Sequence, residues 1–233
     1  MAETGKRRRL TPNDRRAEIL VAARALFAER GLSEVSVSQV IARAGLSKGG
    51  FYHHFDTKEA LVAQVVAEFA EEVLAAALPV LSQPGPALDC LNAFFATAIT
   101  HKLNARDDVQ IASDAVTTAS ADELLREVRA RVQDQMREAF VRLVERGRAE
   151  GAFQPVDAEI VADCIFAFER SRLAAYLRSK SLPREEATAL MLERSRAESR
   201  TLDRLLGLPD GSISYGTETE FRAVMAGVKT SKE

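Results

Sequence analysis

Residues 36–55 read SVSQVIARAGLSKGGFYHHF and predict two short helices joined by a tight turn. Ser36 precedes an apolar stripe with the i, i+3, i+4 spacing of one helix face, so it is expected to cap the first helix. Gly45 can adopt the left-handed backbone that ends a helix, and Ser47 is expected to cap a second helix over 48–54. Two short helices around such a turn are the layout of a helix-turn-helix DNA-binding motif.

The second of these helices has an apolar and a polar side. Phe51 and Phe55 are four residues apart and are expected to pack inward. Lys48, Tyr52 and His53 are left on the other side, where they can meet another molecule.

Gly49 and Gly50 stand side by side in the same helix. Each glycine costs about 1 kcal/mol relative to alanine in a helix interior, so the pair needs a reason. The absence of Cβ lets the backbone approach another surface closely, and a DNA groove is one such surface. The alternative is that both lie in the first helical turn, where the cost is smaller.

Residues 13–61 carry several short motifs in a fixed order. They include an L-F-x-x-x-G helix end, a valine-isoleucine-alanine helix, an A-G-x-S-K-G turn and a Y-x-x-F-x-x-K-E-x-L close. Their members are Leu26, Phe27, Gly31, Val37, Ile41, Ala42, Ala44, Gly45, Ser47, Lys48, Gly49, Tyr52, Phe55, Lys58, Glu59 and Leu61. Together they resemble the N-terminal domain of TetR-family transcriptional regulators, over roughly a fifth of the chain. The resemblance implies three N-terminal helices, a larger helical C-terminal domain and a dimer held by the last two helices.

Length and composition exclude several classes of protein. With 233 residues and 46% hydrophobic residues, the chain can bury one sizeable core or two smaller ones. It has no apolar run long enough to span a membrane, and no apolar segment follows the basic run at 6–9 as a secretory signal requires. Cys90 and Cys164 are far apart in apolar helical contexts. They are expected to be reduced core residues of a cytoplasmic protein, with a redox pair as the alternative.

The net charge of −2 is unevenly distributed. Residues 1–58 hold 11 Lys and Arg against six Asp and Glu, a net charge of +5, and the remainder of the chain carries −7. The positive part contains the helix-turn-helix, as expected where phosphates bind.

Helical spacing continues along the rest of the chain, and no segment shows the alternation of a strand. Helices are expected over 12–30, 58–79, 86–103, 120–150, 158–179 and 183–206, with short ones at 106–119 and 218–227. Consecutive helices with short loops predict an all-α fold, with an N-terminal three-helix DNA-binding domain and a C-terminal helical bundle. The expected divisions are a basic disordered arm (1–10), the helix-turn-helix domain (11–56), an effector-binding and dimerisation domain (57–206) and a polar tail (207–233). The basic arm either enters a minor groove or is a solvated tail.

The polar side of the helix-turn-helix provides the predicted DNA contacts. Lys48 is expected to meet a guanine or a phosphate, and Tyr52 and His53 phosphates or base edges. Serines near helix N-termini and Lys58 are expected to bind phosphates. The full predicted set is Ser36, Ser38, Gln39, Ser47, Lys48, Gly49, Gly50, Tyr52, His53 and Lys58.

A small-molecule site is expected among the middle helices, because aromatic and methionine side chains with a few polar groups suit such a cavity. Its predicted lining is Phe94, Phe95, His101, Met136, Phe140, Phe166, Glu169, Arg172 and Tyr176. The alternative is that these residues simply fill the core. Glu169 and Arg172 are spaced i, i+3 and can also pair with each other.

The segment 158–206 contains two long helices joined by a short link, which suits dimerisation as a four-helix bundle. A homodimer is favoured over an intramolecular layer, because one recognition helix reads too few bases and paired half-sites fit paired subunits. Residues 193–201 lack large apolar side chains, so this part of the interface is expected to be polar or solvated.

No catalytic, metal or cofactor motif occurs in the sequence. His53 and His54 are adjacent, so their side chains point about 100° apart on a helix and cannot share a metal well. The chain is therefore expected to need no cofactor and to be no enzyme.

The sequence as a whole predicts a cytoplasmic homodimeric repressor, associated with the bacterial nucleoid when bound to DNA. It would bind a palindromic operator in double-stranded DNA and be released by a small-molecule effector. The alternatives are a constitutive regulator without an effector, a transcriptional activator, a helical adaptor protein and an all-helical enzyme.

Overall fold

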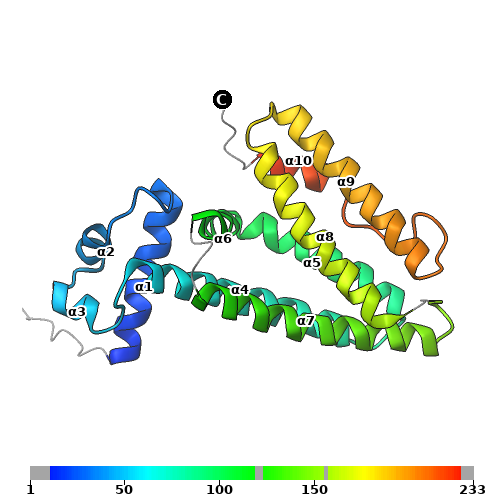
Figure 1. Ribbon diagram of the computed structural model, residues 1–233, viewed down its shortest axis with the longest axis horizontal. Coiled ribbons are helices and arrows are strands. Elements are labelled where there is room, and N and C mark those ends of the chain that lie inside the picture. The colour runs from blue at the N-terminus through cyan, green and yellow to red at the C-terminus, as the bar shows by residue number, and fades with distance from the viewer. Residues whose placement is uncertain (1–10, 119–122, 155–156, 227–233) are drawn as a thin grey trace, which may run out of the picture. The chain divides into compact units, whose positions relative to one another are not determined.

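The structure is a computed structural model that describes residues 11–118, 123–154 and 157–226 (Figure 1). Within these ranges every regular element is a helix and no strand occurs, which confirms the predicted all-α fold. The helices are α1 (Pro12–Arg30), α2 (Val37–Ala44), α3 (Lys48–Tyr52), α4 (Lys58–Ser82), α5 (Ala87–Asn104), α6 (Arg106–Thr118), α7 (Glu123–Ala149), α8 (Ala158–Ser179), α9 (Arg184–Leu205) and α10 (Glu218–Ala226). No helix in the described part of the chain is both long and apolar enough to cross a bilayer.

The helices begin where the sequence places capping residues. Thr11 forms a capping box with Asp14 at the start of α1. Ser36 caps α2, Ser47 caps α3, and the Asp157 carboxylate accepts a hydrogen bond from the third residue of α8. Local hydrogen bonding at these positions therefore sets the element boundaries.

Two predicted boundaries differ from the structure. The second helix of the helix-turn-helix was expected over 48–54, but α3 ends at Tyr52. The helix expected to stop at Pro79 continues to Ser82 with the proline inside it. At Pro79 the helix lacks one backbone hydrogen bond, so its last turn is held more weakly than the turns before it. The capping box expected at 120–123 begins outside the described residues, and α7 starts at its last member.

Internal contacts divide the chain into two units, which are described separately. The first, here called the reader unit, contains residues 11–68, 110–118 and 123–125. The second, here called the C-terminal unit, contains 69–109 and the described residues from 126 onward. This division differs from the predicted boundary at residue 57, because the start of α4 and most of α6 bury apolar side chains in the core of the reader unit.

The core of the reader unit joins all three helices of the predicted DNA-binding domain to α4. Phe51 of α3 is fully buried and Phe55 is 3% exposed, as the sequence predicts. They pack with Val40 of α2 and with Leu61 and Val62 of α4. The polar side of α2–α3 consequently remains outside.

The C-terminal unit is built on a large apolar cluster from α4, α5, α7 and α8. Helices α8 and α9 form an antiparallel hairpin, side by side in Figure 1. Helix α10 packs on α9 and α5 through a smaller cluster that includes Phe221 and Met225.

The segment 207–233 was predicted to be a polar tail, but its described part, 207–226, packs against the rest of the C-terminal unit. Ile213 and Tyr215 are only 2% and 3% exposed, and they belong to the large apolar cluster. The short helix expected at 218–227 is confirmed as α10. The segment 207–217, here called the strap, is therefore part of the packed structure.

Two buried side chains hold the strap. The carboxylate of Asp203 on α9 is fully buried and accepts hydrogen bonds from the backbone N–H groups of Gly211 and Ile213, at 2.7 and 2.9 Å. Asn92 on α5 donates to one strap carbonyl at 2.9 Å and accepts from a strap N–H at 3.1 Å. The strap is thus bonded to α5 and α9 together, although these helices are far apart in the sequence.

Candidate DNA-binding site

The turn between α2 and α3 has the geometry that the sequence predicts. Gly45 has φ of 64° and ψ of 36°, which is the left-handed conformation that glycine adopts without strain. Leu46 packs partly against the core of the reader unit, so the turn is fixed by burial on one side. This places the first turn of α3 directly after α2.

Helix α3 presents a polar face to solvent. Lys48, Gly49, Tyr52 and His53 are exposed, and Tyr52 retains 43% of its surface. The Lys48 ammonium lies 6.0 Å from the centroid of the Tyr52 ring, so a cation and an aromatic hydroxyl share this face. Next to them, burial lowers the pKa of His54, and electrostatic repulsion from the neighbouring His53 and Arg16 lowers this pKa further.

The two glycines of α3 have different surroundings. A Cβ added at Gly49 would meet no atom within 4 Å. A Cβ added at Gly50 would lie 3.3 Å from Oγ of Ser47, the hydroxyl that accepts the Gly50 N–H and caps the helix. Packing within the protein thus gives a reason for glycine at 50 and none at 49, where close approach by another molecule stays the prediction.

The other predicted phosphate ligands differ in their exposure and in the hydrogen bonds that they make within the protein. Ser36 and Ser38 are exposed at the N-terminus of α2. Gln39 is half-buried, and its Oε1 accepts the Ser36 N–H at 2.7 Å to complete a capping box. The half-buried Lys58 donates from Nζ to the backbone carbonyl of Leu32 at 2.7 Å.

Two further contacts in the reader unit were not predicted. Arg43 of α2 pairs with Glu29 of α1 through two contacts of 2.6 and 2.9 Å. Arg16 donates to Oε1 of Gln64 at 3.1 Å, and its guanidinium lies 4.9 Å from the centroid of the Phe55 ring. No local sequence pattern could have revealed them, because the partners are 14 to 48 residues apart.

The predicted ligand-lining residues are mostly packed in the core of the C-terminal unit. Those in its large apolar cluster, as buried members or partly buried neighbours, are Phe94, Phe95, Met136, Phe140 and Phe166. His101 stacks on Phe69 with ring centroids 5.6 Å apart, and its Nε2 is buried without a hydrogen-bond partner among the described residues. Tyr176 packs partly against the smaller cluster.

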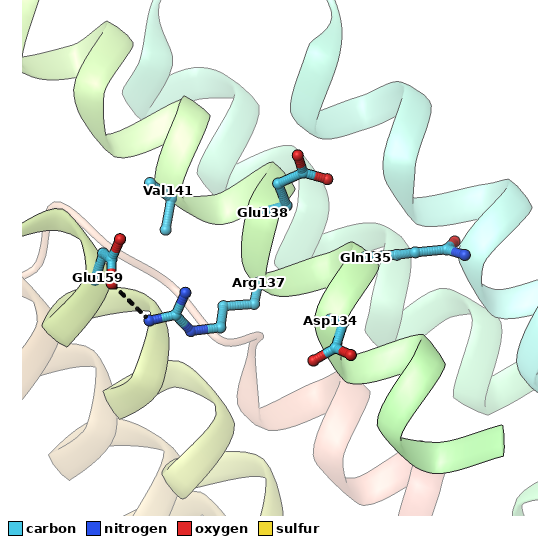
Figure 2. Close-up of a pocket in the computed structure, with 6 residues that line it drawn as sticks. All are labelled: Asp134, Gln135, Arg137, Glu138, Val141 and Glu159. Carbon is cyan, nitrogen blue, oxygen red and sulfur yellow. Dashed lines mark hydrogen bonds and ion pairs between the residues drawn. The ribbon is translucent and has the colours of Figure 1, made fainter. Parts of the chain in front are cut away.

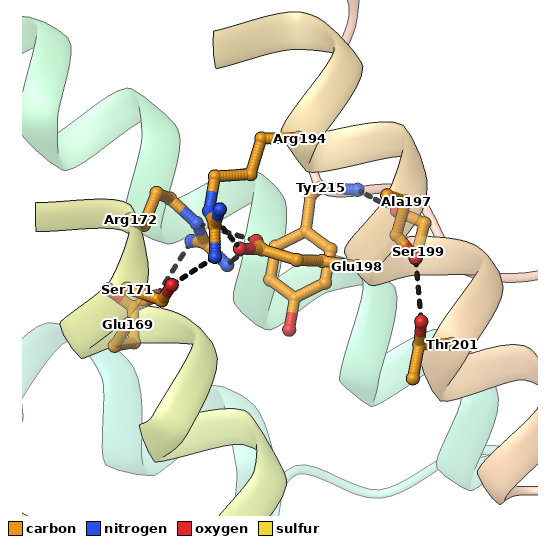
Figure 3. A network of polar contacts seen from close by, with 9 residues as sticks. All are labelled: Glu169, Ser171, Arg172, Arg194, Ala197, Glu198, Ser199, Thr201 and Tyr215. Atoms are coloured by element: carbon orange, nitrogen blue, oxygen red, sulfur yellow. Dashed lines mark hydrogen bonds and ion pairs between the residues drawn. The ribbon is translucent and has the colours of Figure 1, made fainter. Parts of the chain in front are cut away.

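Glu169 and Arg172 do pair, at 2.8 Å, but as part of a larger network that Figure 3 shows. Arg172 also pairs at 2.7 Å with Glu198, whose side chain is 5% exposed, and Glu198 pairs with Arg194 at 3.1 Å. Burial opposes the charged form of Arg172, but Glu169 and Glu198 outweigh it and raise its pKa. The charges in this network therefore balance.

Tyr215 of the strap completes the network on its apolar side. The ring centroids of Tyr215 and Phe95 are 3.9 Å apart, and the Arg172 guanidinium lies 4.3 Å from the centroid of the Tyr215 ring. Burial raises the pKa of Tyr215, so the hydroxyl stays neutral. That hydroxyl is buried and makes no hydrogen bond of ordinary geometry among the described residues, although the nearby Arg172 guanidinium acts to lower its pKa. The sequence does not point to Tyr215, because the polar and turn-rich composition of 207–233 predicts a polar tail.

Two open hollows, each of about 390 Å³, occur on the C-terminal unit. One lies at α7 and α8, where Arg137 reaches Glu159 at 3.1 Å (Figure 2). The other lies at α8 and α9 and is lined by Phe168, Leu190, Glu193, Arg194, Ala197, Glu198 and Thr201. None of the predicted ligand residues lines either hollow. Over the described residues, no group of His, Cys, Asp and Glu side chains could hold a metal ion.

Comparison with known proteins agrees with the geometry of α2 and α3. Residues 19–65 match the model of the bacterial regulatory proteins of the tetR family. The HTH-type transcriptional repressor KstR2 of Mycolicibacterium smegmatis is 28% identical over 159 residues, which cover 68% of this chain and 76% of the relative. The chain belongs to the TetR family.

Solved structures of TetR-family regulators share the fold. One from Pectobacterium atrosepticum matches with a TM-score of 0.69 and 22% identity, over 85% of this chain and 97% of that one. KstR2 of Mycobacterium tuberculosis, described as a ketosteroid transcriptional regulator, matches with a TM-score of 0.51 and 28% identity, over 65% of this chain and 77% of that one. This TetR-family chain is thus a DNA-binding transcriptional regulator and not an enzyme.

Proposed function

We propose that this regulator is a homodimeric repressor that places α3 in the major groove of a palindromic operator and is released by a small molecule. The observation that supports DNA reading most directly is the exposed face of α3. It combines the Lys48 cation and the Tyr52 hydroxyl with Gly49, where nothing within the protein requires the absence of a side chain.

Each exposed group has a distinct proposed role. Lys48 reaches a guanine edge or a phosphate, and Tyr52 and His53 reach phosphates or base edges. Gly49 lets the helix backbone approach the groove. Ser36 and Ser38 contribute with the N-terminus of α2, where free N–H groups favour phosphate.

The proposed dimer uses the face of α8 and α9 that surrounds the second hollow. Phe168, Leu190 and Ala197 lie there, while the strap and α10 occupy other faces of α9. The stretch 193–201, which was expected to be polar or solvated, is divided: Ser195, Glu198 and Ser199 are buried within the protomer, whereas Glu193 is exposed at the hollow. The interface would then combine an apolar hollow with a polar rim, a common composition.

The proposed effector is a small apolar molecule with one polar group, bound in the C-terminal unit. The aromatic core residues and the unpartnered hydroxyl of Tyr215 support it. The resemblance to KstR2, a ketosteroid regulator, adds a steroid-like compound as a first candidate.

A constitutive repressor without an effector is the second candidate. It is favoured by the close packing of Phe94, Phe95, Met136 and Phe140, which are at most 8% exposed. A thermal-shift series with steroid ketones and other apolar compounds separates the two. A compound that raises the Tm of the protein and also releases it from DNA supports an effector-controlled repressor. If no compound does both, the constitutive repressor is supported.

Selection of bound duplexes from a random pool, followed by gel-shift titration, tests the DNA-reading proposal. The double variant Lys48→Ala/Tyr52→Ala should lose most of its operator affinity while keeping its Tm. Lys180→Ala is a matched control, since that ammonium also lies near a tyrosine ring, 5.2 Å from Tyr176 in the C-terminal unit. Unchanged operator affinity in the double variant would contradict the role of α3.

A further inference from the structure

We propose that Lys58 is a positioning residue of the DNA reader and not a phosphate ligand. Its ammonium fixes the loop that leads into α2 to the first turn of α4. The inference rests on the proposed function in one respect, since it takes α2 and α3 as the elements that read DNA.

The central contact is between Lys58 Nζ and the backbone carbonyl of Leu32, at 2.7 Å in a partly buried position. Leu32 lies just after the end of α1, and its side chain is 6% exposed. A carbonyl beyond a helix end has no partner within that helix, so a partner must come from elsewhere in the fold. A charged donor makes a shorter and stronger hydrogen bond than a neutral one, which suits Lys58 to hold this loop.

The held loop determines where α2 begins. Only three residues separate Leu32 from Ser36, the cap of α2. Between them, Val35 is 1% exposed and anchors the loop in the core from the other side. A hydrogen bond at Leu32 therefore fixes the N-terminus of α2, where Ser36 and Ser38 are proposed to meet phosphate.

A second contact supports the same arrangement one turn and a half further along α4. Gln64 accepts a hydrogen bond from Arg16 of α1 at 3.1 Å, and the Arg16 guanidinium lies over the Phe55 ring just after α3. The first two turns of α4 are thus bonded to the loop before α2 and to α1. Within the reader unit, Lys58 thus adds a polar contact to the apolar packing of Leu61 and Val62 with Val40 of α2.

The burial of the Lys58 side chain and the salt dependence of DNA binding distinguish a positioning role from phosphate binding. The Lys58 side chain is half-buried and donates to a backbone carbonyl, whereas Lys48 is exposed and lies over the Tyr52 ring. A lysine that neutralises a phosphate releases counterions, so its loss reduces the salt dependence of binding. A lysine that acts only on the shape of the reader leaves that dependence unchanged.

The test measures operator affinity over a range of salt concentrations for Lys58→Met, Lys58→Arg and Lys48→Met, by fluorescence anisotropy with the selected operator duplex. Lys58→Met should weaken binding by about tenfold, as expected for the loss of one charge-assisted hydrogen bond, with an unchanged slope of log K against log salt. Lys58→Arg should recover most of the affinity, because a guanidinium can still donate to the Leu32 carbonyl. Lys48→Met should lower the magnitude of the slope by about 0.9, the value for one phosphate contact.

The comparison is made well below the Tm of each variant, so that loss of fold is not counted as loss of binding. Amide hydrogen exchange gives a second readout, and Lys58→Met should speed exchange over 33–37. A slope that falls by about 0.9 in Lys58→Met would show phosphate binding instead and overturn the proposal. Unchanged affinity in Lys58→Met would also overturn it. If Lys48→Met has no effect either, the proposed function fails and not merely this inference.

Discussion

Single residues of α3 show how neighbours with the same identity can have different functions. Gly49 and Gly50 look equivalent in the sequence, and both could have been explained by close approach to DNA. The structure separates them, because only a Cβ at position 50 would crowd the Ser47 cap. At position 49 a side chain would point to the surface and would meet no other part of the protein.

Alanine substitutions should reveal this difference. Gly49→Ala should raise the free energy of unfolding by up to about 1 kcal/mol, because alanine favours the helix, while it weakens operator binding. Gly50→Ala should gain less stability, since its methyl group strains the capping hydroxyl. Urea unfolding and gel-shift titration measure the two effects, and full operator affinity in Gly49→Ala would refute close approach at this position.

A buried hydroxyl makes a second prediction at the level of one residue. Tyr215→Phe removes only the unpartnered oxygen and keeps the contacts with Phe95 and Arg172. The free energy of unfolding of the variant should be higher by about 1 kcal/mol, because an unsatisfied buried polar group is costly. The variant should therefore unfold at a higher urea concentration. A clear loss of stability would show that the hydroxyl has a partner in solution. Tyr215→Phe should also respond less to the proposed effector.

Among the elements, the strap departs most from what its composition suggests. Its three glycines, two serines and single proline are typical of a solvated tail, yet Ile213 and Tyr215 are among the buried residues of the core. The fully buried carboxylate of Asp203 makes this possible, because it satisfies two backbone N–H groups that would otherwise be buried without partners.

Removing that carboxylate should be strongly destabilising. Asp203→Ala should lower the free energy of unfolding by about 3 kcal/mol, because two charge-assisted hydrogen bonds are lost and their donors are left unpaired. The exposed Asp210 in the same strap provides the control, and Asp210→Ala should change stability by less than about 0.5 kcal/mol. Chemical denaturation of the two variants tests this, and equal effects would mean that the strap is not held by Asp203.

At the scale of the whole molecule, the proposed two-fold operator would require a second copy of the chain. Ala197 is exposed beside the hollow at α8 and α9, where the proposed partner packs. A single protomer offers only one α3, which contacts too few base pairs for specificity. Dimerisation and operator affinity should therefore be lost together.

A carboxylate buried in that interface should prevent association. Ala197→Glu should shift the protein to a monomer in sedimentation and weaken operator binding at least about tenfold, because an unpaired charge in an interface is costly. Thr219→Glu places the same charge on an exposed position of α10 and should leave both properties unchanged. A dimeric Ala197→Glu protein would move the interface elsewhere.

Local sequence is enough to predict most of the helices and the kind of site they form. Capping hydroxyls at Ser36 and Ser47, the turn at Gly45 and the apolar spacing of Phe51 and Phe55 act over a few residues, so their effects can be read locally. The family motifs depend on the same short spacings.

The partners of distant polar residues, by contrast, depend on the three-dimensional fold. It bonded Lys58 to the Leu32 carbonyl, buried Glu198 between Arg172 and Arg194, and joined the strap to Asn92 and Asp203. Apart from Arg194, which lies one helical turn before Glu198 on α9, these partners are close in space but separated along the chain. A polar side chain in a sequence therefore indicates that it needs a partner, and the fold alone decides whether that partner is water, DNA or the protein itself.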